Sequence, residues 1–240
     1  MTKGLIIGSV ALLIGLVITL SSCTVLKPRA YPHGEKKIIL TIDDGPSTDT
    51  TRQLLAVFQK HQIPVSFCFI GENMEEHPAL VKEALDQGHH IVLHSHHHTE
   101  RDLFDRDRME ESLTRYKDTM SQAGYPVTSE RILFRPPFGW VTPQVFAFAR
   151  QHDLQYAHVT SYVHDSPMNH EDQHSLFRQL QRKVQRAQGG AIVLHESHHR
   201  AKHSHQPIDK SWLPAALDAF ISWALSEGYE FVHYPSGTSQ

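Results

Sequence analysis

The chain is poor in cysteine, with only Cys23 and Cys68 among its 240 residues. A framework of several disulfides is therefore excluded, because such scaffolds need more cysteines than this. Cys68 lies within the apolar stretch 65–70, where a free cysteine behaves as a small buried hydrophobic residue. We assign no function to it.

The chain also lacks a large excess of either charge. Its formal net charge is −3 and no basic stripe is present, which gives no electrostatic reason to expect nucleic-acid binding. A hydrophobic content of 40% and a charged content of 20% are typical of a globular protein. The length suits one α/β barrel domain. Histidine is the exception to this ordinary composition, with 20 residues.

The amino terminus has the features of an export signal. Lys3 precedes the uncharged apolar stretch 4–20, which leads into Ser21, Ser22 and Cys23. This order is typical of a secretory signal peptide, and residues 20–23 resemble the lipobox of bacterial lipoproteins. We expect a signal peptide over 1–22, a membrane anchor through a lipid on Cys23, a tether over 23–36 and a domain over 37–235 in the bacterial cell envelope, outside the cytoplasm. The alternative is an uncleaved signal anchor, since about 17 apolar residues can just span a bilayer.

Strand-like and helix-like stretches alternate through the expected domain. The expected strands are 37–42, 65–70, 90–93, 132–134, 155–159, 191–194 and 230–232. The expected helices are 51–61, 78–87, 109–123, 143–151, 174–188 and 213–227. This alternation predicts a single α/β domain with a parallel sheet and right-handed crossovers, either as an open sheet or as a closed barrel.

Two adjacent carboxylates follow the first expected strand. Asp43 and Asp44 are followed at once by Gly45-Pro46, which is also ordinary turn chemistry. Adjacent residues at a strand end point in different directions, so one carboxylate can bind a cation while the other accepts a proton. Two such neighbours oppose each other's ionisation unless a cation or an arginine compensates.

Two histidines follow the third expected strand. The spacing of His94 and His98 puts both imidazoles on one side of a single helical turn, if a helix forms there. Two imidazoles and one carboxylate suit zinc with an open position for water, and a facial set of this kind also suits non-haem iron. A surface histidine cluster is the alternative in a chain so rich in histidine.

Two further strand ends carry polar residues. Arg135 follows the fourth expected strand and can hold a carboxylate through a bidentate contact, while Pro136 and Pro137 stiffen its loop and direct the backbone N–H of Phe138 inward. His195 ends the sixth expected strand, where it can act as a general acid near neutral pH. In a barrel these strand ends all meet on one face, which is where catalytic residues lie.

Together these segments resemble the polysaccharide deacetylase family of carbohydrate esterases, also called the NodB-homology family. Its first motif is similar to residues 41–46, its second to His94-Ser95-x-x-His98, its third to Arg135-Pro136-Pro137-Phe138 and its fifth to Val193-Leu194-His195. The family's fourth motif pairs an aspartate with a tryptophan. This chain has Asp165 at that place and no tryptophan.

The resemblance implies a distorted (β/α)7-type barrel and a role for each motif residue. Asp44, His94 and His98 would bind a divalent metal, with zinc favoured and cobalt, nickel or another divalent ion also compatible. Asp43, aligned by Arg135, would be the base that takes a proton from water. The backbone N–H of Phe138 would help to hold the oxyanion. His195, supported by Asp165, would protonate the leaving amine.

The implied activity is N-deacetylation of a glycan built from N-acetylglucosamine-type units. O-deacetylation of an acetylated glycan by the same residues is a second possibility. A third is a non-catalytic metal or glycan binder, because the polar loop 198–205 contains further histidines and such tracts can bind metal. An intact base and acid favour an enzyme, since a binder needs neither.

Overall fold

The computed structural model describes residues 24–25, 35–127, 132–197 and 209–235. The expected signal peptide, Cys23, most of the tether and the histidine-rich loop 198–205 lie outside these residues. Within the described part of the chain, no helix has both the length and the apolar character needed to cross a bilayer.

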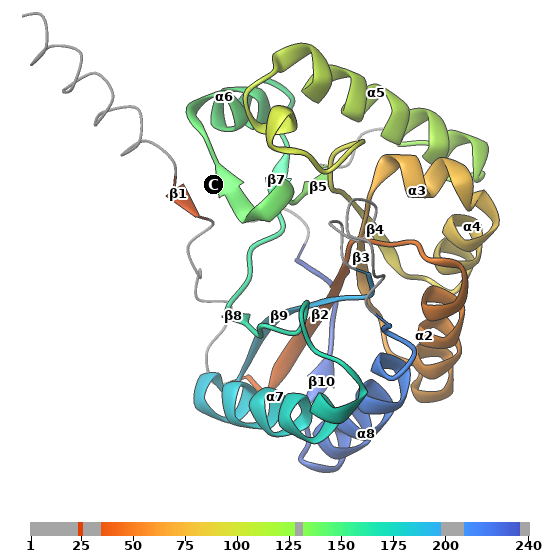
Figure 1. Ribbon diagram of the computed structural model, residues 1–240, viewed down its shortest axis with the longest axis vertical. Coiled ribbons are helices and arrows are strands. Elements are labelled where there is room, and N and C mark those ends of the chain that lie inside the picture. Colours follow the sequence, from red (N-terminus) through yellow and green to blue (C-terminus); the bar gives the residue numbers. More distant parts are fainter. Residues whose placement is uncertain (1–23, 26–34, 128–131, 198–208, 236–240) are drawn as a thin grey trace, which may run out of the picture.

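A curled parallel sheet of eight strands forms the centre of the domain (Figure 1). The strands are ordered β7-β5-β4-β3-β2-β9-β8, and β10 pairs with the start of β2. Their bounds are Lys37–Asp43 (β2), Ser66–Phe69 (β3), His90–Leu93 (β4), Leu133–Phe134 (β5), Gln155–Tyr156 (β7), Ser161–Tyr162 (β8), Gly189–His195 (β9) and Glu230–Phe231 (β10). No pairing among the described residues joins β7 to β8, so the barrel is incomplete on that side.

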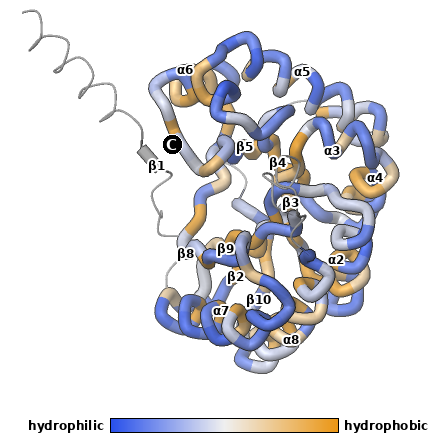
Figure 2. Tube along the Cα trace, viewed as in Figure 1, coloured by the Kyte–Doolittle hydropathy of each residue, from blue (hydrophilic) through white to orange (hydrophobic). Residues whose placement is uncertain are grey.

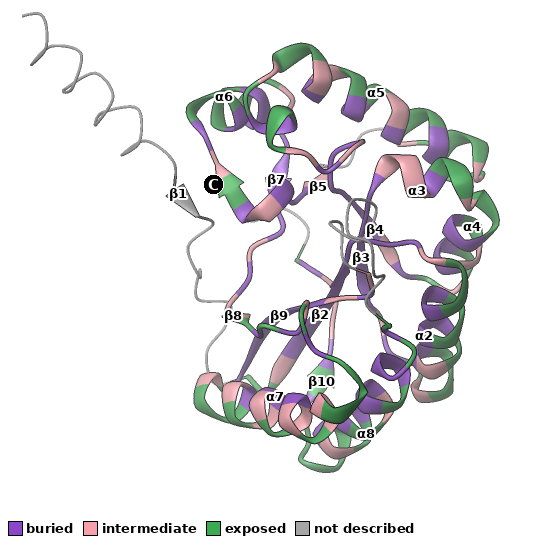
Figure 3. Cartoon of the chain, in the orientation of Figure 1, coloured by how far each residue is buried: buried purple, intermediate pink, exposed green. Residues whose placement is uncertain are grey.

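Helices cover the outer face of the sheet (Figure 1). Their bounds are Thr48–His61 (α2), Gly71–Glu76 (α3), Pro78–Asp86 (α4), Arg106–Gln122 (α5), Pro143–Gln151 (α6), Gln173–Ala187 (α7) and Leu213–Ser226 (α8). Buried and exposed residues, and hydrophobic and hydrophilic ones, recur in turn along most of these helices, as Figures 2 and 3 show. In α2, for example, the buried residues include Leu54, Leu55 and Phe58 at helical spacing.

The side chains of β2 point alternately to two faces of the sheet, one in the main core and one toward the polar site. Ile38, Leu40 and Ile42 pack into the main core beneath the helices. Side chains alternate along a strand, so the odd-numbered residues point into the curl. There Ile39 belongs to a small apolar cluster that includes Cys68, which is fully buried as the sequence predicts. Beyond that cluster the concave face becomes polar.

Strand register then fixes which polar residues are neighbours. Strand β9 pairs with β2 along its whole length and places Asp43 opposite His195. Leu93 pairs with Phe134, so His94 and Arg135, the residues that follow them, emerge side by side. The carboxyl ends of these strands therefore meet on one face, as predicted.

The predicted barrel-type α/β fold is confirmed, and each expected strand and helix has a counterpart close to its expected bounds. Several short elements were not expected, among them α3 and β8. Expected strand 155–159 ends already at Tyr156, after which the chain crosses to pair as β8 beside β9. Only the first part of that apolar stretch has a strand partner on β5.

Two further small elements lie near the pocket described below. A 3-10 turn, Pro137–Gly139 (η2), is followed by a two-residue strand, Trp140–Val141 (β6). Strand β6 pairs antiparallel with Thr24–Val25 (β1). These elements follow directly from Arg135 at the end of β5.

Candidate active site

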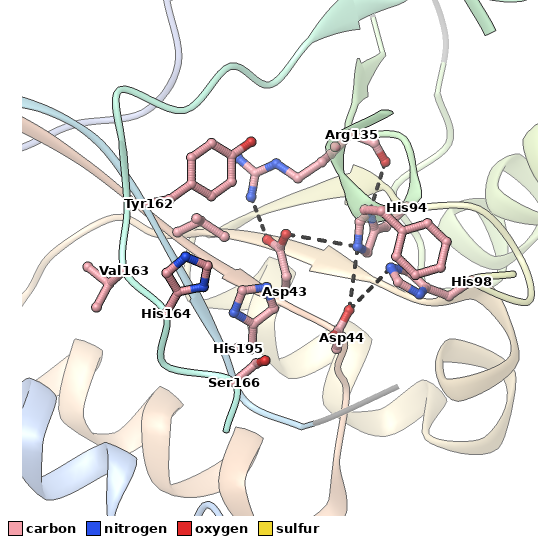
Figure 4. A pocket seen from close by; sticks show the side chains of 13 residues that line it. Asp43, Asp44, His94, His98, Arg135, Tyr162, Val163, His164, Ser166 and His195 are labelled. Atoms are coloured by element: carbon pink, nitrogen blue, oxygen red, sulfur yellow. Dashed lines mark hydrogen bonds and ion pairs between the residues drawn. The ribbon is translucent and has the colours of Figure 1, made fainter. Parts of the chain in front are cut away.

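A pocket of about 410 Å³ opens at the carboxyl ends of the strands (Figure 4). It gathers seven of the eight residues that the sequence singled out, from segments far apart in the chain. Its lining residues are Asp43, Asp44, His94, His98, Arg135, Phe138, Gly139, Tyr162, Val163, His164, Ser166, Val193 and His195. The eighth residue, Asp165, lies behind His195.

The backbone conformation directs the side chains of Asp43 and Asp44 apart. Asp43 is the last residue of β2, and Asp44 has a left-handed φ of 71°, which turns its side chain away from that of its neighbour. The carbonyl of Asp44 accepts hydrogen bonds from Asn73 Nδ2 (3.2 Å) and Ser197 Oγ (2.6 Å). The expected turn is thus part of the site, and two side chains hold it in place.

His94 and His98 both face Asp44. The Nε2 atom of each imidazole lies 3.5 Å from Asp44 Oδ1, and the two rings are 4.7 Å apart between centroids. The expected helical turn between them is wrong. Ser95 and His98 have positive φ values of 61° and 52°, so a tight loop rather than a helix brings the imidazoles together.

These three residues fit a divalent metal. His94 Nδ1 hydrogen-bonds the carbonyl oxygen of Arg135 at 2.8 Å, which requires the proton on Nδ1 and leaves the lone pair of Nε2 directed at Asp44. Two atoms bound to tetrahedral zinc at about 2.0–2.1 Å lie about 3.3 Å apart. The observed spacing of 3.5 Å is close to that value.

Arg135 is buried and holds Asp43. Its Nη1 donates to Asp43 Oδ1 at 2.5 Å and to Thr41 Oγ1 at 2.8 Å. The expected bidentate contact is wrong, because Nη2 instead donates to Ala157 O and to the Tyr234 hydroxyl. Burial alone would lower the pKa of Arg135, but the charge of Asp43 outweighs burial and raises it. Arg135 therefore stays positively charged beside Asp43.

His195 is held by Asp165 in two ways. Asp165 Oδ1 lies 2.8 Å from His195 Nδ1, and Asp165 Oδ2 accepts the backbone N–H of His195 at 2.7 Å. Burial alone would lower the pKa of His195, but the charge of Asp165 and this hydrogen bond raise it to about 9. Imidazolium is thus the favoured form at neutral pH, with Nε2 left for a substrate.

Phe138 has a left-handed φ of 59° within the 3-10 turn η2. Its ring packs edge-on against His98, with 4.9 Å between centroids. The Phe138 side chain therefore packs against His98, one of the candidate metal ligands. The expected role of its backbone N–H stays a prediction.

Several residues at the site carry no recognisable motif and were not predicted. Tyr162, His164 and Ser166 form the wall at the place where a family tryptophan was missing from the sequence. Lys210 is buried, and its Nζ donates to the carbonyl of Asp165. Only the two-residue strand β8, too short to show periodicity, brings this wall to the pocket.

Glu196 is a second unpredicted group. It is fully enclosed behind the Asp44 turn, where Thr51 and Ser47 donate to its carboxyl group. Burial raises the pKa of Glu196 to about 8, although these hydrogen bonds act in the opposite direction. A proton on Glu196 is therefore favoured at neutral pH.

His96 and His97 face away from the pocket. His97 Nδ1 pairs with Glu72, and Arg115 Nη1 lies 3.1 Å from His96 Nε2. The ligand atoms of Glu72, His96 and His97 lie within 4.8 Å of one another. In this second cluster the guanidinium of Arg115 already supplies a positive charge beside His96, where a bound metal ion would otherwise lie.

The pocket thus brings three groups of residues together. The candidate metal ligands lie beside Asp43, which Arg135 holds, and His195, which Asp165 holds (Figure 4). A candidate proton acceptor, a candidate proton donor and residues that could hold a metal on one concave face suit hydrolysis of an acyl bond.

Known proteins are similar to most of this chain. A peptidoglycan-N-acetylglucosamine deacetylase of Bacillus cereus is 28% identical over 213 residues, which cover 86% of this chain and 92% of the relative. PgdA of Listeria monocytogenes, described with the same activity, is 28% identical over 208 residues, covering 85% of this chain but only 39% of the relative. The structure of Bacillus subtilis PdaA, a family 4 carbohydrate esterase, superposes with a TM-score of 0.67 at 21% identity and covers 92% of this chain and 86% of that one. A family model for polysaccharide deacetylase matches residues 30–157, and the chain belongs to that family.

Proposed function

We propose that this protein is a metal-dependent N-deacetylase that removes acetyl groups from N-acetylglucosamine units of a cell-envelope glycan. The observation that carries the proposal is the arrangement of Asp43–Arg135 and His195–Asp165 around Asp44, His94 and His98. A protein that only binds metal would have no use for a fixed base and a fixed acid.

Each residue has a task that follows from its contacts. Asp43 accepts a proton from the attacking water, and Arg135 keeps it ionised and aimed. His195 gives its proton to the leaving nitrogen of the sugar, while Asp165 holds the ring and favours its protonated form. Phe138 itself has a left-handed backbone conformation and lines the pocket wall. Its backbone N–H donates to the oxyanion.

Asp44, His94 and His98 would hold the metal, for which zinc is the best fit to two imidazoles and one carboxylate. When bound there, a divalent ion acts as a Lewis acid on the acetyl carbonyl and makes water easier to deprotonate. The hydrogen bond from His94 to the Arg135 carbonyl orients one ligand, and Phe138 packs on the other.

The glycan is proposed to be peptidoglycan or a chemically similar polymer. The Bacillus cereus relative, which this chain matches over most of both lengths, is named for this activity, and that supports this choice. A pocket of about 410 Å³ also lies in the range of roughly 300–1,000 Å³ that small-ligand sites occupy. The location proposed is the cell envelope, with the domain tethered through a lipid on Cys23, on the basis of the residues at the amino terminus.

The test is acetate release from defined N-acetylglucosamine oligomers and from purified peptidoglycan, before and after treatment with a chelator. We expect release that the chelator abolishes and added zinc restores. Release that persists without metal would overturn the metal dependence. No release from any substrate would favour the non-catalytic binder.

The competing activity is O-deacetylation by the same residues. Product analysis separates the two, because N-deacetylation leaves a free amine and O-deacetylation leaves a free hydroxyl. Activity on an O-acetylated xylan without activity on any N-acetylated glycan would replace the proposed substrate.

A further inference from the structure

We propose that Trp140 forms a second sugar subsite, which stacks on the ring of a unit next to the one that is deacetylated. This inference rests on the proposed function, because the occupant is another unit of the same glycan. It makes the protein selective for linked N-acetylglucosamine units over single sugars.

A continuous row of aromatic rings leads from the metal ligands to the surface. The His98 ring lies 4.9 Å from the Phe138 ring, and the Phe138 ring lies 5.7 Å from the Trp140 ring, between centroids. Exposure increases along this row. His98 is buried, Phe138 is half-buried and Trp140 is 41% exposed.

Trp140 is also fixed in position relative to the pocket. It directly follows Phe138 and Gly139, which both line the pocket, and its main chain pairs with Val25 in the two-stranded sheet of β1 and β6. Side chains stand roughly perpendicular to a sheet, so this pairing limits the direction of the indole. A preorganised ring loses little conformational entropy when a ligand stacks on it.

The exposure of this tryptophan is unusual within the chain. The other two tryptophans lie in the core or against it, with Trp212 only 2% exposed and Trp223 partly buried. Single exposed apolar side chains are common and need no function. Trp140 differs because its ring packs against Phe138, which lines the pocket, so it lies next to a concave site, where exposed apolar surface can mark ligand binding.

The opposite wall supports a bound chain. Tyr162 lines the pocket from β8 and is 37% exposed, and its hydroxyl lies 3.0 Å from the place a Cβ would take on Gly139. Two partly exposed aromatic residues are thus present here, Tyr162 on β8 in the pocket wall and Trp140 on β6 against the lining residue Phe138. A pyranose ring has an apolar C–H face and polar edges, which match an aromatic platform beside polar wall residues such as His164 and Ser166.

Stacking at Trp140 would add binding energy away from the reacting acetyl group. An enzyme can use such remote binding energy to position the reacting unit. A short substrate that does not reach the subsite gains nothing from it. The effect of removing the indole must therefore depend on substrate length.

The experiment compares Trp140→Ala with the unaltered zinc-loaded protein on N-acetylglucosamine itself and on its β-1,4-linked pentamer. We expect kcat/KM for the pentamer to fall about tenfold, mainly through KM, with the single sugar changed less than twofold. Trp140→Phe should recover a large part of the pentamer activity. Phe146→Ala is the matched control, because Phe146 is 48% exposed on α6 and is not among the pocket residues.

An equal loss on both substrates, or no loss on either, would overturn the subsite. Failure of the proposed function is distinguishable, since it would appear as no acetate release from the unaltered protein. Pentamer binding by calorimetry keeps the subsite testable in that case. Tighter binding to the Asp43→Asn protein than to the same protein carrying Trp140→Ala supports the subsite, and equal binding refutes it.

Discussion

At the residue scale, the site depends on charges that are held in pairs. Asp43 is paired with Arg135, and His195 is paired with Asp165, each through a hydrogen bond inside the protein. In the proposed function, one partner of each pair takes part in proton transfer and the other holds it in position. The two partners therefore differ in what their removal should do.

Replacing Asp43 by Asn should abolish acetate release while the metal content stays close to one ion per chain. Loss of a general base costs on the order of 10²–10⁴ in rate. The metal ligands keep their own contacts in this variant. Acetate assays together with elemental analysis of the purified protein test this expectation.

His98→Ala is the comparison, because it should lower metal content as well as activity. Activity close to that of the unaltered protein in Asp43→Asn would remove Asp43 from the role of base.

The pH dependence of the activity should follow the titration of His195. Its pKa of about 9 lies above the ordinary value of 6.5, so the acid form is present at neutral pH and is lost as the pH rises through about 9. Activity should decline on that alkaline side. In Asp165→Asn, which removes the charge that raises the pKa, the decline should begin at least about one pH unit lower.

Asp49→Asn is a suitable control for this profile, since Asp49 is exposed on α2 and should leave it unchanged. An alkaline limb at the same pH in Asp165→Asn and the unaltered protein would show that another group titrates there.

At the element scale, short connections place the site residues while longer elements supply the frame. The loop after β4 brings His94 and His98 together through two left-handed residues. Helix α3 has only six residues, too few to show a periodic pattern in the sequence. It nevertheless delivers Asn73, whose side chain donates to the carbonyls of Asp44 and Gly45 at 3.2 and 3.4 Å.

Replacing Asn73 by Ala should therefore loosen the Asp44 turn and weaken the metal site. Groups that orient metal ligands typically contribute about 10–100-fold to metal affinity or activity. We expect a decrease of at least about tenfold in zinc affinity, measured by competition with a chromogenic chelator.

Glu75→Ala on the same helix is the matched control, because its partner Arg115 lies on the surface. If the two variants bound zinc equally well, Asn73 would have no positioning role.

At the scale of the whole molecule, the curled sheet concentrates titratable groups in its interior. Glu196 and His195 both have pKa values raised in the folded protein, to about 8 and about 9 from 4.5 and 6.5. The folded protein therefore binds protons more tightly than the unfolded chain. Their contribution to stability is complete below the unfolded pKa values and is lost as the pH rises through the folded ones.

The free energy of unfolding of the metal-free protein should thus decrease between about pH 6 and pH 9, by a few kcal/mol as an order of magnitude. Urea unfolding at both pH values, with chelator present, measures this difference. In Glu196→Gln the free energy of unfolding should fall less over this pH interval, because the glutamine side chain does not titrate. An unfolding free energy that rises over this interval would contradict the assignment of both groups.

The amino-acid sequence determined much of this protein by itself. Apolar periodicity defined most strands and helices, because buried faces repeat at fixed spacing in each kind of element. The rule that parallel strands end on one face predicted that Asp43, His94, Arg135 and His195 would meet. The family motifs added Asp165 and gave each site residue an expected role.

Only the tertiary structure decided how these residues touch. A positive φ at Ser95 and His98 replaced the expected helical turn, and competition from Ala157 and Tyr234 left Arg135 only one nitrogen for Asp43. No local sequence pattern predicts the wall of Tyr162 and His164, the buried Glu196 or the row of rings that ends at Trp140. They depend on strand register and on loops whose conformation is set by long-range contacts, which no short stretch of sequence encodes alone.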